Sequence, residues 1–140
     1  MERQIVIQYP DSNILLKVKK LAACLGEIVD VDDTIICNIC LNSKDSDIAS
    51  RIETLKQLNL IDLIEITPLK GQEQNRTYNL IIYLCNIVHF LMIVEEYELN
   101  ALIMAAGVKL FINDNDGDFI IIDSKHKKFH KVKSFLMAYK

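Results

Sequence analysis

The chain has few of the residues that mark phosphate-binding loops and linkers. It contains four glycines and two prolines among 140 residues, and no tryptophan. The glycines are scattered, so no glycine-rich loop that could hold a phosphate is present. There is also no internal repeat, low-complexity segment or obvious linker. One domain spanning residues 1–140 is the simplest expectation at this length.

Positive charge is also scarce. Lys and Arg number 16 against 19 Asp and Glu, giving a formal net charge of −3. Such a balance provides no general attraction to nucleic acid, so a nucleic-acid partner would have to meet a local basic patch. The one strongly basic region is the tail from Lys125 to Lys140, where Phe129, Val132, Leu136 and Tyr139 share a helical face. We expect the tail to dock by that face; an anionic membrane surface or DNA phosphates are the alternatives.

Signals for export or membrane insertion are missing. No opening segment has the basic, apolar and small-residue layout of a signal peptide. The most apolar run, Leu80–Val94, is interrupted by Asn86 and His89 and is short for a membrane span. We therefore expect a soluble cytoplasmic protein, or a nucleoid or nuclear one if it binds DNA. Its four cysteines should stay free in a reducing compartment.

The cysteines allow one zinc hypothesis. Cys37 and Cys40 have the two-residue gap of a zinc knuckle, and Cys85 and His89 lie four apart, spacings that on helices point ligands in one direction. Both pairs lie in strongly apolar segments, where buried thiols acting as small hydrophobic side chains are commoner. We therefore predict no metal and no cofactor. Redox sensing by Cys24 or Cys40 is a further alternative.

Calcium binding and catalysis are disfavoured on similar grounds. Asp114, Asp116, Gly117 and Asp123 match positions of an EF-hand loop, but the first ligand position would be Ile112, which cannot bind a cation. A β-hairpin turn explains this segment better. Scattered Ser, His and Asp residues form no nucleophile motif, so we predict that the protein is not an enzyme.

Hydrophobic spacing and turn residues predict the first half of the chain. A short strand or extended arm is expected over residues 3–9, then a helix over residues 14–26 that Gly26 closes. Residues 34–41 are predicted as a second, short helix because Asp32 and Asp33 are good caps.

The remaining elements follow from the same signals. A helix from Ser46 should stop at Asn59, since Asn tolerates the left-handed conformation well. A hairpin over residues 61–80 is expected next. Residues 80–107 are predicted to be helical and, over 80–97, apolar on nearly every face. A second hairpin over residues 108–123 and a final basic helix capped by Ser124 complete the chain.

The spacing in the helix from Ser46 and in the hairpin behind it carries a family resemblance. Apolar and turn residues recur at Ile48, Ile52, Leu55, Asn59, Leu60 and Ile61; a Ser-Arg pair stands at 50–51; Arg76, Tyr78 and Leu80 close the hairpin. Cys37 and Leu41 fall at the core positions of the preceding helix. This order over about residues 15–80 resembles the winged helix-turn-helix transcriptional regulators of the multiple-antibiotic-resistance-regulator and arsenical-repressor type. Asn42 and Ser43 depart from the family's turn, where a glycine and an aliphatic residue are usual.

The resemblance implies an α+β fold with a winged-helix core over about residues 14–80 and a C-terminal extension over about 81–140 with further helices and a second β-hairpin. It also implies a small DNA-binding transcriptional regulator. Ser46, Ser50, Arg51 and Thr54 would face the major groove, and Lys70 and Arg76 on the wing would neutralise phosphates. A homodimer through residues 80–107 would match a two-fold symmetric operator and would cover the apolar helix.

Two alternatives to a DNA-binding regulator stay open. On the expected reading helix, Arg51 and Lys56 are offset by Asp47 and Glu53. That balance, together with the surplus of apolar surface, suits a winged-helix protein–protein interaction module of a larger assembly. A viral or mobile-element accessory protein with an unrelated α+β fold is the other alternative.

Overall fold

One antiparallel sheet organises the molecule in the computed structural model, which describes residues 2–7, 13–30, 33–42, 46–69, 72–114 and 117–137. Seven strands follow one another across it in the order β1-β7-β6-β5-β2-β4-β3. Their bounds are β1 Glu2–Val6, β2 Ile35–Asn42, β3 Ile61–Leu69, β4 Gln72–Ile82, β5 Ala101–Ala105, β6 Val108–Asp114 and β7 Gly117–Asp123.

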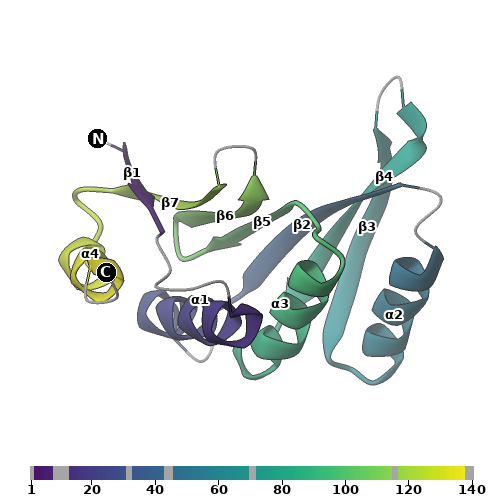
Figure 1. Ribbon diagram of the computed structural model, residues 1–140, viewed down its shortest axis with the longest axis horizontal. Coiled ribbons are helices and arrows are strands. Elements are labelled where there is room, and N and C mark those ends of the chain that lie inside the picture. The colour runs from purple at the N-terminus through teal and green to yellow at the C-terminus, as the bar shows by residue number, and fades with distance from the viewer. Residues whose placement is uncertain are drawn as a thin grey trace.

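The helices lie together on one face of this sheet (Figure 1). They are α1 Ile14–Ile28, α2 Ser46–Gln57, α3 Ile87–Glu96, preceded by the 3₁₀ turn η1 Leu84–Asn86, and α4 Phe129–Met137. The helices α1 and α3 pack side by side under the middle of the sheet, α2 lies beside the edge strand β3, and α4 lies at the β1 end (Figure 1). The expected α+β class is confirmed.

Local sequence signals predict the start of α1 correctly but not its end. Asn13 caps the helix by accepting a hydrogen bond from the Leu16 amide at 3.2 Å. The prediction that Gly26 closes the helix is wrong, because α1 continues to Ile28 and the Val29 amide still donates to Leu25 at 2.9 Å. Leu25 and Ile28 are both buried in the core. Their burial offsets the cost of a helical glycine, which is about 1 kcal/mol.

The helix α2 ends as the sequence predicts. Ile48 and Ile52 are buried beneath it and Leu55 is half-buried. Asn59 adopts a φ of 59°, while the amides of Leu60 and Asn59 donate to the carbonyls of Leu55 and Lys56. This pair of bonds is the Schellman arrangement that satisfies the last carbonyls of a helix. The left-handed stop at Asn59 is thus confirmed.

The short helix predicted over residues 34–41 is wrong. Those residues form β2, which pairs with β4 on one side and β5 on the other. Ile35, Cys37 and Ile39 alternate toward the helices and are fully buried, as a strand period of two requires. A strand therefore precedes α2 where a helix-turn-helix would need a helix.

The helical continuation predicted to Gly107 is also wrong. The helix α3 ends at Glu96, and Glu98 takes a left-handed φ of 52° while the Leu99 amide donates to Val94 at 2.9 Å. The chain then enters β5 and turns into β6 through Ala106 and Gly107, both at positive φ. Two positive-φ residues between paired strands make a type I′ hairpin turn.

A dimer through residues 80–107 was expected because an apolar helix there would need covering, and the structure does not contain that helix. The segment 80–97 is not one helix, because it comprises the end of β4, η1 and α3. Ile87, Phe90, Leu91 and Val94 are all buried within this one chain. The apolar face that these four residues form is therefore covered within the chain, while Val88 on the same helix stays 39% exposed.

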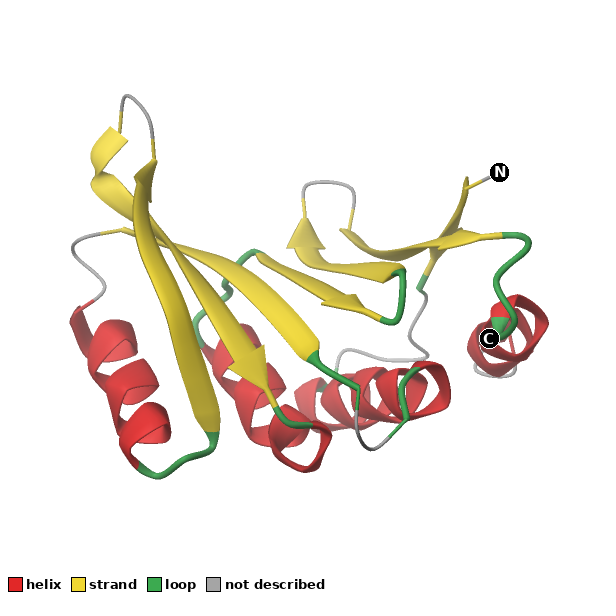
Figure 2. Ribbon diagram, turned by 180° about the vertical axis from the view of Figure 1, so that it is seen from behind, coloured by secondary structure: helices red, strands yellow, loops and turns green. Residues whose placement is uncertain are grey.

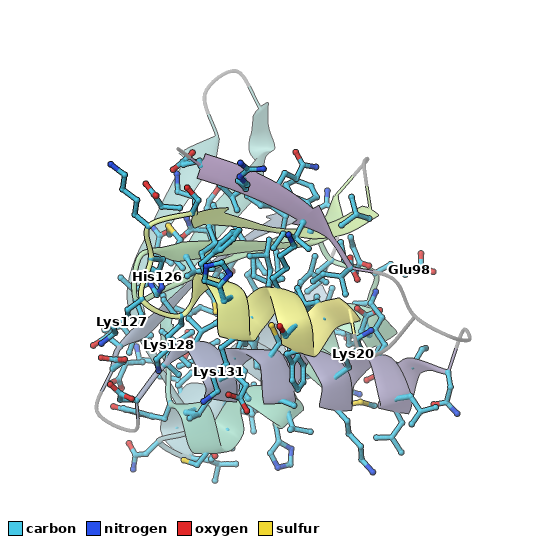
Figure 3. The ribbon with its side chains drawn as sticks, turned by 90° about the vertical axis from the view of Figure 1, so that its left-hand side faces the viewer. Lys20, Glu98, His126, Lys127, Lys128 and Lys131 are labelled. Carbon is cyan, nitrogen blue, oxygen red and sulfur yellow. The ribbon has the colours of Figure 1, made fainter. Side chains whose placement is uncertain are left out.

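The strand at the N-terminus, the two hairpins and the docking of the final helix by its apolar face agree with the sequence predictions. The predicted cap at Ser124 is wrong, because α4 begins at Phe129. The hairpins are β3–β4 and β6–β7. On α4, Phe129, Val132 and Leu136 are buried; Tyr139 lies outside the described residues. Lys128, which precedes α4, and Lys131 on it pair with Asp30 and Glu27 at 3.5 and 2.9 Å. These lysines lie beside α1 (Figure 3), so the tail docks by its apolar face and by two exposed ion pairs.

Candidate functional site

The residues predicted to read DNA are only partly brought together. Ser50, Arg51 and Thr54 are exposed on α2. The Thr54 hydroxyl donates to the Ser50 carbonyl at 3.0 Å. Lys70 lies outside the described residues. For Ser46, at the start of α2, and for Arg76, in β4, the structure describes the backbone and not the side chain.

Arg51 has partners within the chain. Its Nη1 lies 3.4 Å from Oε2 of Glu96, and its guanidinium carbon lies 5.3 Å from the centre of the Tyr97 ring. These contacts join α2 to the end of α3. Both charged side chains are about half exposed, so the ion pair contributes little to stability. It does, however, engage the arginine that was expected to face the major groove.

The candidate zinc ligands do not assemble. Cys37 is fully buried on β2, whereas Cys85 on η1 and His89 on α3 are exposed. Cys37 and Cys40 would point in one direction if they lay on a helix, but both stand on the strand β2. The Cys40 side chain is not described. Within the described part of the chain, no three His, Cys, Asp or Glu residues are grouped so as to hold a metal ion.

Burial makes two of the thiols unreactive. It raises the pKa of Cys37 well above its ordinary value and the pKa of Cys24 to about 12. Because the thiolate is the reactive form, neither is suited to redox chemistry near neutral pH. Cys85 is the exposed free thiol among the described cysteines.

A buried ion cluster that the sequence did not reveal joins three parts of the fold. The Lys17 ammonium on α1 lies 2.6 Å from Glu95 Oε1 on α3 and 3.0 Å from Asp118 Oδ2 on β7. It also donates to Asn113 Oδ1 at 3.2 Å. Burial lowers the pKa of Lys17, but its bonds to the two carboxylates outweigh that effect and leave it raised.

Asn113 completes this cluster through a strained backbone. It stands at a φ of 57° where β6 departs from regular pairing. Its amide donates to Asp118 at 2.8 Å, and its side-chain nitrogen donates to the Leu99 carbonyl at 3.0 Å. The ions of the cluster therefore bind one another, which is the arrangement of a structural lock and not of a site awaiting substrate.

The sheet face opposite the helices, which we call the open face, differs in its side chains from most solvated sheet faces. In Figure 2 its strands lie above the helices. In most antiparallel sheets with one solvated face, the outward positions are polar. Here the outward positions include Ile36, Ile81, Leu102, Met104, Phe111, Phe119 and Ile121, as the strand register shows.

Two of these side chains contact each other across neighbouring strands. The rings of Phe111 and Phe119 stack with centroids 4.7 Å apart and planes inclined by 14°. Phe119 is buried, while Phe111 and Leu102 are half-buried. At the β1 edge, Val6 is 55% exposed. The open face thus carries half-buried apolar side chains on several neighbouring strands, with polar positions such as Asn38 and Asn79 among them.

A shallow hollow of about 200 Å³ lies within the open face. Leu102 and Phe111 form an apolar part of its wall, and Asn38, Thr77 and Asn100 supply polar groups. An apolar floor beside a few amide and hydroxyl groups can both bury a side chain and orient a backbone by hydrogen bonds. The hollow is smaller than the pockets that enclose whole small-molecule ligands.

Comparisons of the chain with protein-family models, with curated proteins and with solved structures find no significant match. Among the helices described, none has both the length and the apolar character needed to cross a bilayer. The candidate site therefore depends on the chemistry of the open face alone.

Proposed function

We propose that the protein is a protein-interaction module that binds through its open face. The observation that carries this proposal is the row of apolar side chains at outward strand positions, including Ile36, Leu102 and Phe111. Large contiguous apolar patches on soluble proteins mark surfaces that contact another protein, a membrane or a ligand. Covering such a patch removes apolar area from water, which stabilises a complex by about 25 cal/mol per Å².

The polar groups of the hollow would give this binding its direction. Asn38, Thr77 and Asn100 lie beside Leu102 and Phe111. An aromatic and an aliphatic side chain in a partly enclosed site are typical anchors of protein interfaces, and surrounding polar groups fix the orientation of the partner. We infer that the partner inserts an apolar side chain here.

Charge favours a protein over a nucleic acid as the occupant. The chain carries a formal charge of −3. Among the outward side chains from β6 to β3 that the structure describes, the basic one is Lys109. The acidic residue Asp62 stands on the same face. Phosphate binding needs several cations in a row, because counterion release supplies most of the affinity.

DNA reading by α2 is the second candidate. It is favoured by the exposed side chains of Ser50, Arg51 and Thr54 on a helix that is followed by the β3–β4 hairpin. It is weakened by the strand β2 in place of the first helix of a helix-turn-helix pair, and by the contacts of Arg51 with Glu96 and Tyr97. We therefore rank it below protein binding.

The proposed role is binding and not catalysis. Lys17, Glu95 and Asp118, the buried ionisable cluster of the fold, are bound to each other. A general acid or base must be free to exchange a proton with substrate. Nothing in that cluster is arranged to do so.

Affinity capture with matched variants tests the proposal. Tagged wild-type protein, the open-face variant Leu102→Thr/Phe111→Thr and the helix-face variant Leu15→Gln/Leu16→Gln would be used as baits in the source cells. Leu15 and Leu16 are 48% and 50% exposed on α1, which is more than Leu102 and Phe111, so the control removes exposed apolar side chains elsewhere on the molecule. Thr keeps strand propensity and Gln keeps helix propensity.

We expect wild type and the helix-face control to retain the same proteins, and the open-face variant to lose them. Far-UV circular dichroism would establish that all three chains are folded. Recovery of an identical set of proteins by all three baits would contradict the proposal.

A further inference from the structure

We propose that the occupant of the open face is a second copy of this chain, related by a two-fold axis that places Lys109 of each copy against Asp62 of the other. This inference rests on the proposed function and names its partner. It begins from a row of residues that face one another directly across the sheet.

The row runs over five neighbouring strands. Lys109 on β6 pairs with Met104 on β5, Met104 with Ile36 on β2, Ile36 with Ile81 on β4, and Ile81 with Asp62 on β3. A cation and an anion therefore stand two strands to either side of Ile36, with three apolar residues between them; beyond Lys109 the same line of paired residues continues through Ile121 on β7 and Gln4 on β1. Lys109 and Asp62 are both exposed.

This order of charges is complementary to its own reverse. A two-fold axis lying between two copies and parallel to β2 at Ile36 reverses the row, so Lys109 meets the Asp62 position of the other copy and Met104 meets Ile81. Closed two-fold interfaces are made in this way, with one surface patch facing itself. An unrelated partner would have to supply the same reversed charges, whereas a second copy already does.

A hydrogen bond within the chain orients the Asp62 carboxylate for such a contact. The Tyr83 hydroxyl donates to its Oδ2 at 2.7 Å, which fixes the carboxylate at the edge of the open face. A carboxylate accepts several hydrogen bonds, so one donor leaves capacity for an ammonium group.

The area is that of a weak, transient dimer. The five strands from β6 to β3 overlap about this axis; spaced about 4.8 Å apart and each about five residues long at about 3.3 Å per residue, they give a face of about 400 Å². Two copies would bury about 800 Å² in total, which is below the size of a standard stable interface. Two twisted sheets can pack face to face in this way when their strand directions stay within about 30° of each other, as in a β-sandwich.

Reciprocal charge exchange tests the inference by light scattering and sedimentation over protein concentrations of about 1 to 200 µM, a range suited to a small interface. Wild type is expected to be dimeric at the upper concentrations. In Lys109→Asp alone, each copy brings Asp against Asp62 of the other; in Asp62→Lys alone, lysines face each other. Each single variant should raise the dissociation constant by about tenfold or more, because like charges meet twice per dimer.

Two further samples should restore association. An equimolar mixture of the two single variants forms a heterodimer with both charge pairs reinstated, and the double variant Lys109→Asp/Asp62→Lys forms a homodimer. Lys19→Asp and Glu53→Lys, exposed on α1 and α2, serve as controls and should leave association unchanged. Monomeric wild type at every concentration overturns the inference, and so does wild-type association in both single variants.

Failure of this inference is separable from failure of the proposed function. If the wild-type chain is monomeric while Leu102→Thr/Phe111→Thr still loses captured proteins, the open face binds a different protein and the second-copy inference is wrong. If the wild type is monomeric and that variant captures the wild-type set, both proposals are wrong.

Discussion

Replacing Lys17 by methionine is the sharpest test of the buried ion cluster. Lys17, Glu95 and Asp118 have side chains 17%, 8% and 5% exposed. Methionine fills a similar volume but leaves two carboxylates buried beside each other without a cation. Breaking a buried ion pair by removing one partner costs about 3–5 kcal/mol, and we expect about 3 kcal/mol because the lysine retains some contact with water.

Urea unfolding followed by far-UV circular dichroism would measure this loss, since the chain has no tryptophan for fluorescence. The matched control is Lys19→Met on the exposed side of α1. It should change the free energy of unfolding by no more than about 0.5 kcal/mol, as surface substitutions usually do. A loss below about 1 kcal/mol in Lys17→Met would refute the structural role of the cluster.

The pH dependence of the same variant gives a second readout. The pKa of Lys17 is raised above its ordinary value of 10.5 in the folded protein. Its contribution is therefore complete below pH 10.5 and is lost as the pH rises through the raised pKa. Wild type should lose stability over that alkaline range and Lys17→Met should not.

Three other predictions address the helix stop, the thiols and the DNA-binding candidate. Asn59→Ala should cost about 1 kcal/mol and Asn59→Gly close to nothing in the same urea assay, because Asn59 stands at a φ of 59°; equal effects would contradict the left-handed stop. In a Cys40→Ala background, Cys85 should react with a thiol reagent in the native protein and the two buried thiols only after unfolding; three equally fast thiols would contradict the burial. Random duplex DNA at low salt should show no mobility shift; a salt-dependent shift that Arg51→Glu abolishes would favour DNA reading by α2.

The elements that sequence reasoning located correctly carry their own signals. Asn13 caps α1 at the predicted start of that helix, and Asn59 stops α2 where the sequence predicted the stop. The two hairpins were marked by polar turn residues between apolar runs. Each of these signals lies within a few residues of the structure that it specifies.

The elements that were missed depend on distant partners. Residues 34–41 are apolar at nearly every position, and only their pairing with β4 and β5 makes them a strand. At Glu98 the backbone turns left-handed without glycine or asparagine, so no residue type near the end of α3 predicted that end. Lys17 finds its carboxylates on α3 and β7, which no spacing within α1 could indicate.

The sequence has more apolar residues than one core was expected to bury, and a partner was expected to cover the rest. In the structure these residues lie on the open face of the sheet and not on a helix. The sequence attributed this surplus to a helix over residues 80–107. Most of the apolar face of α3 is in fact buried within the chain, and Ile81, Leu102 and Met104 from the same range point outward from β4 and β5 instead. A strand apolar on both sides normally belongs to a sheet covered on both faces. In the described part of this chain the helices cover one face only (Figure 1). This uncovered apolar face is the physical basis for proposing protein binding, and for seeking the partner first in a second copy of the chain.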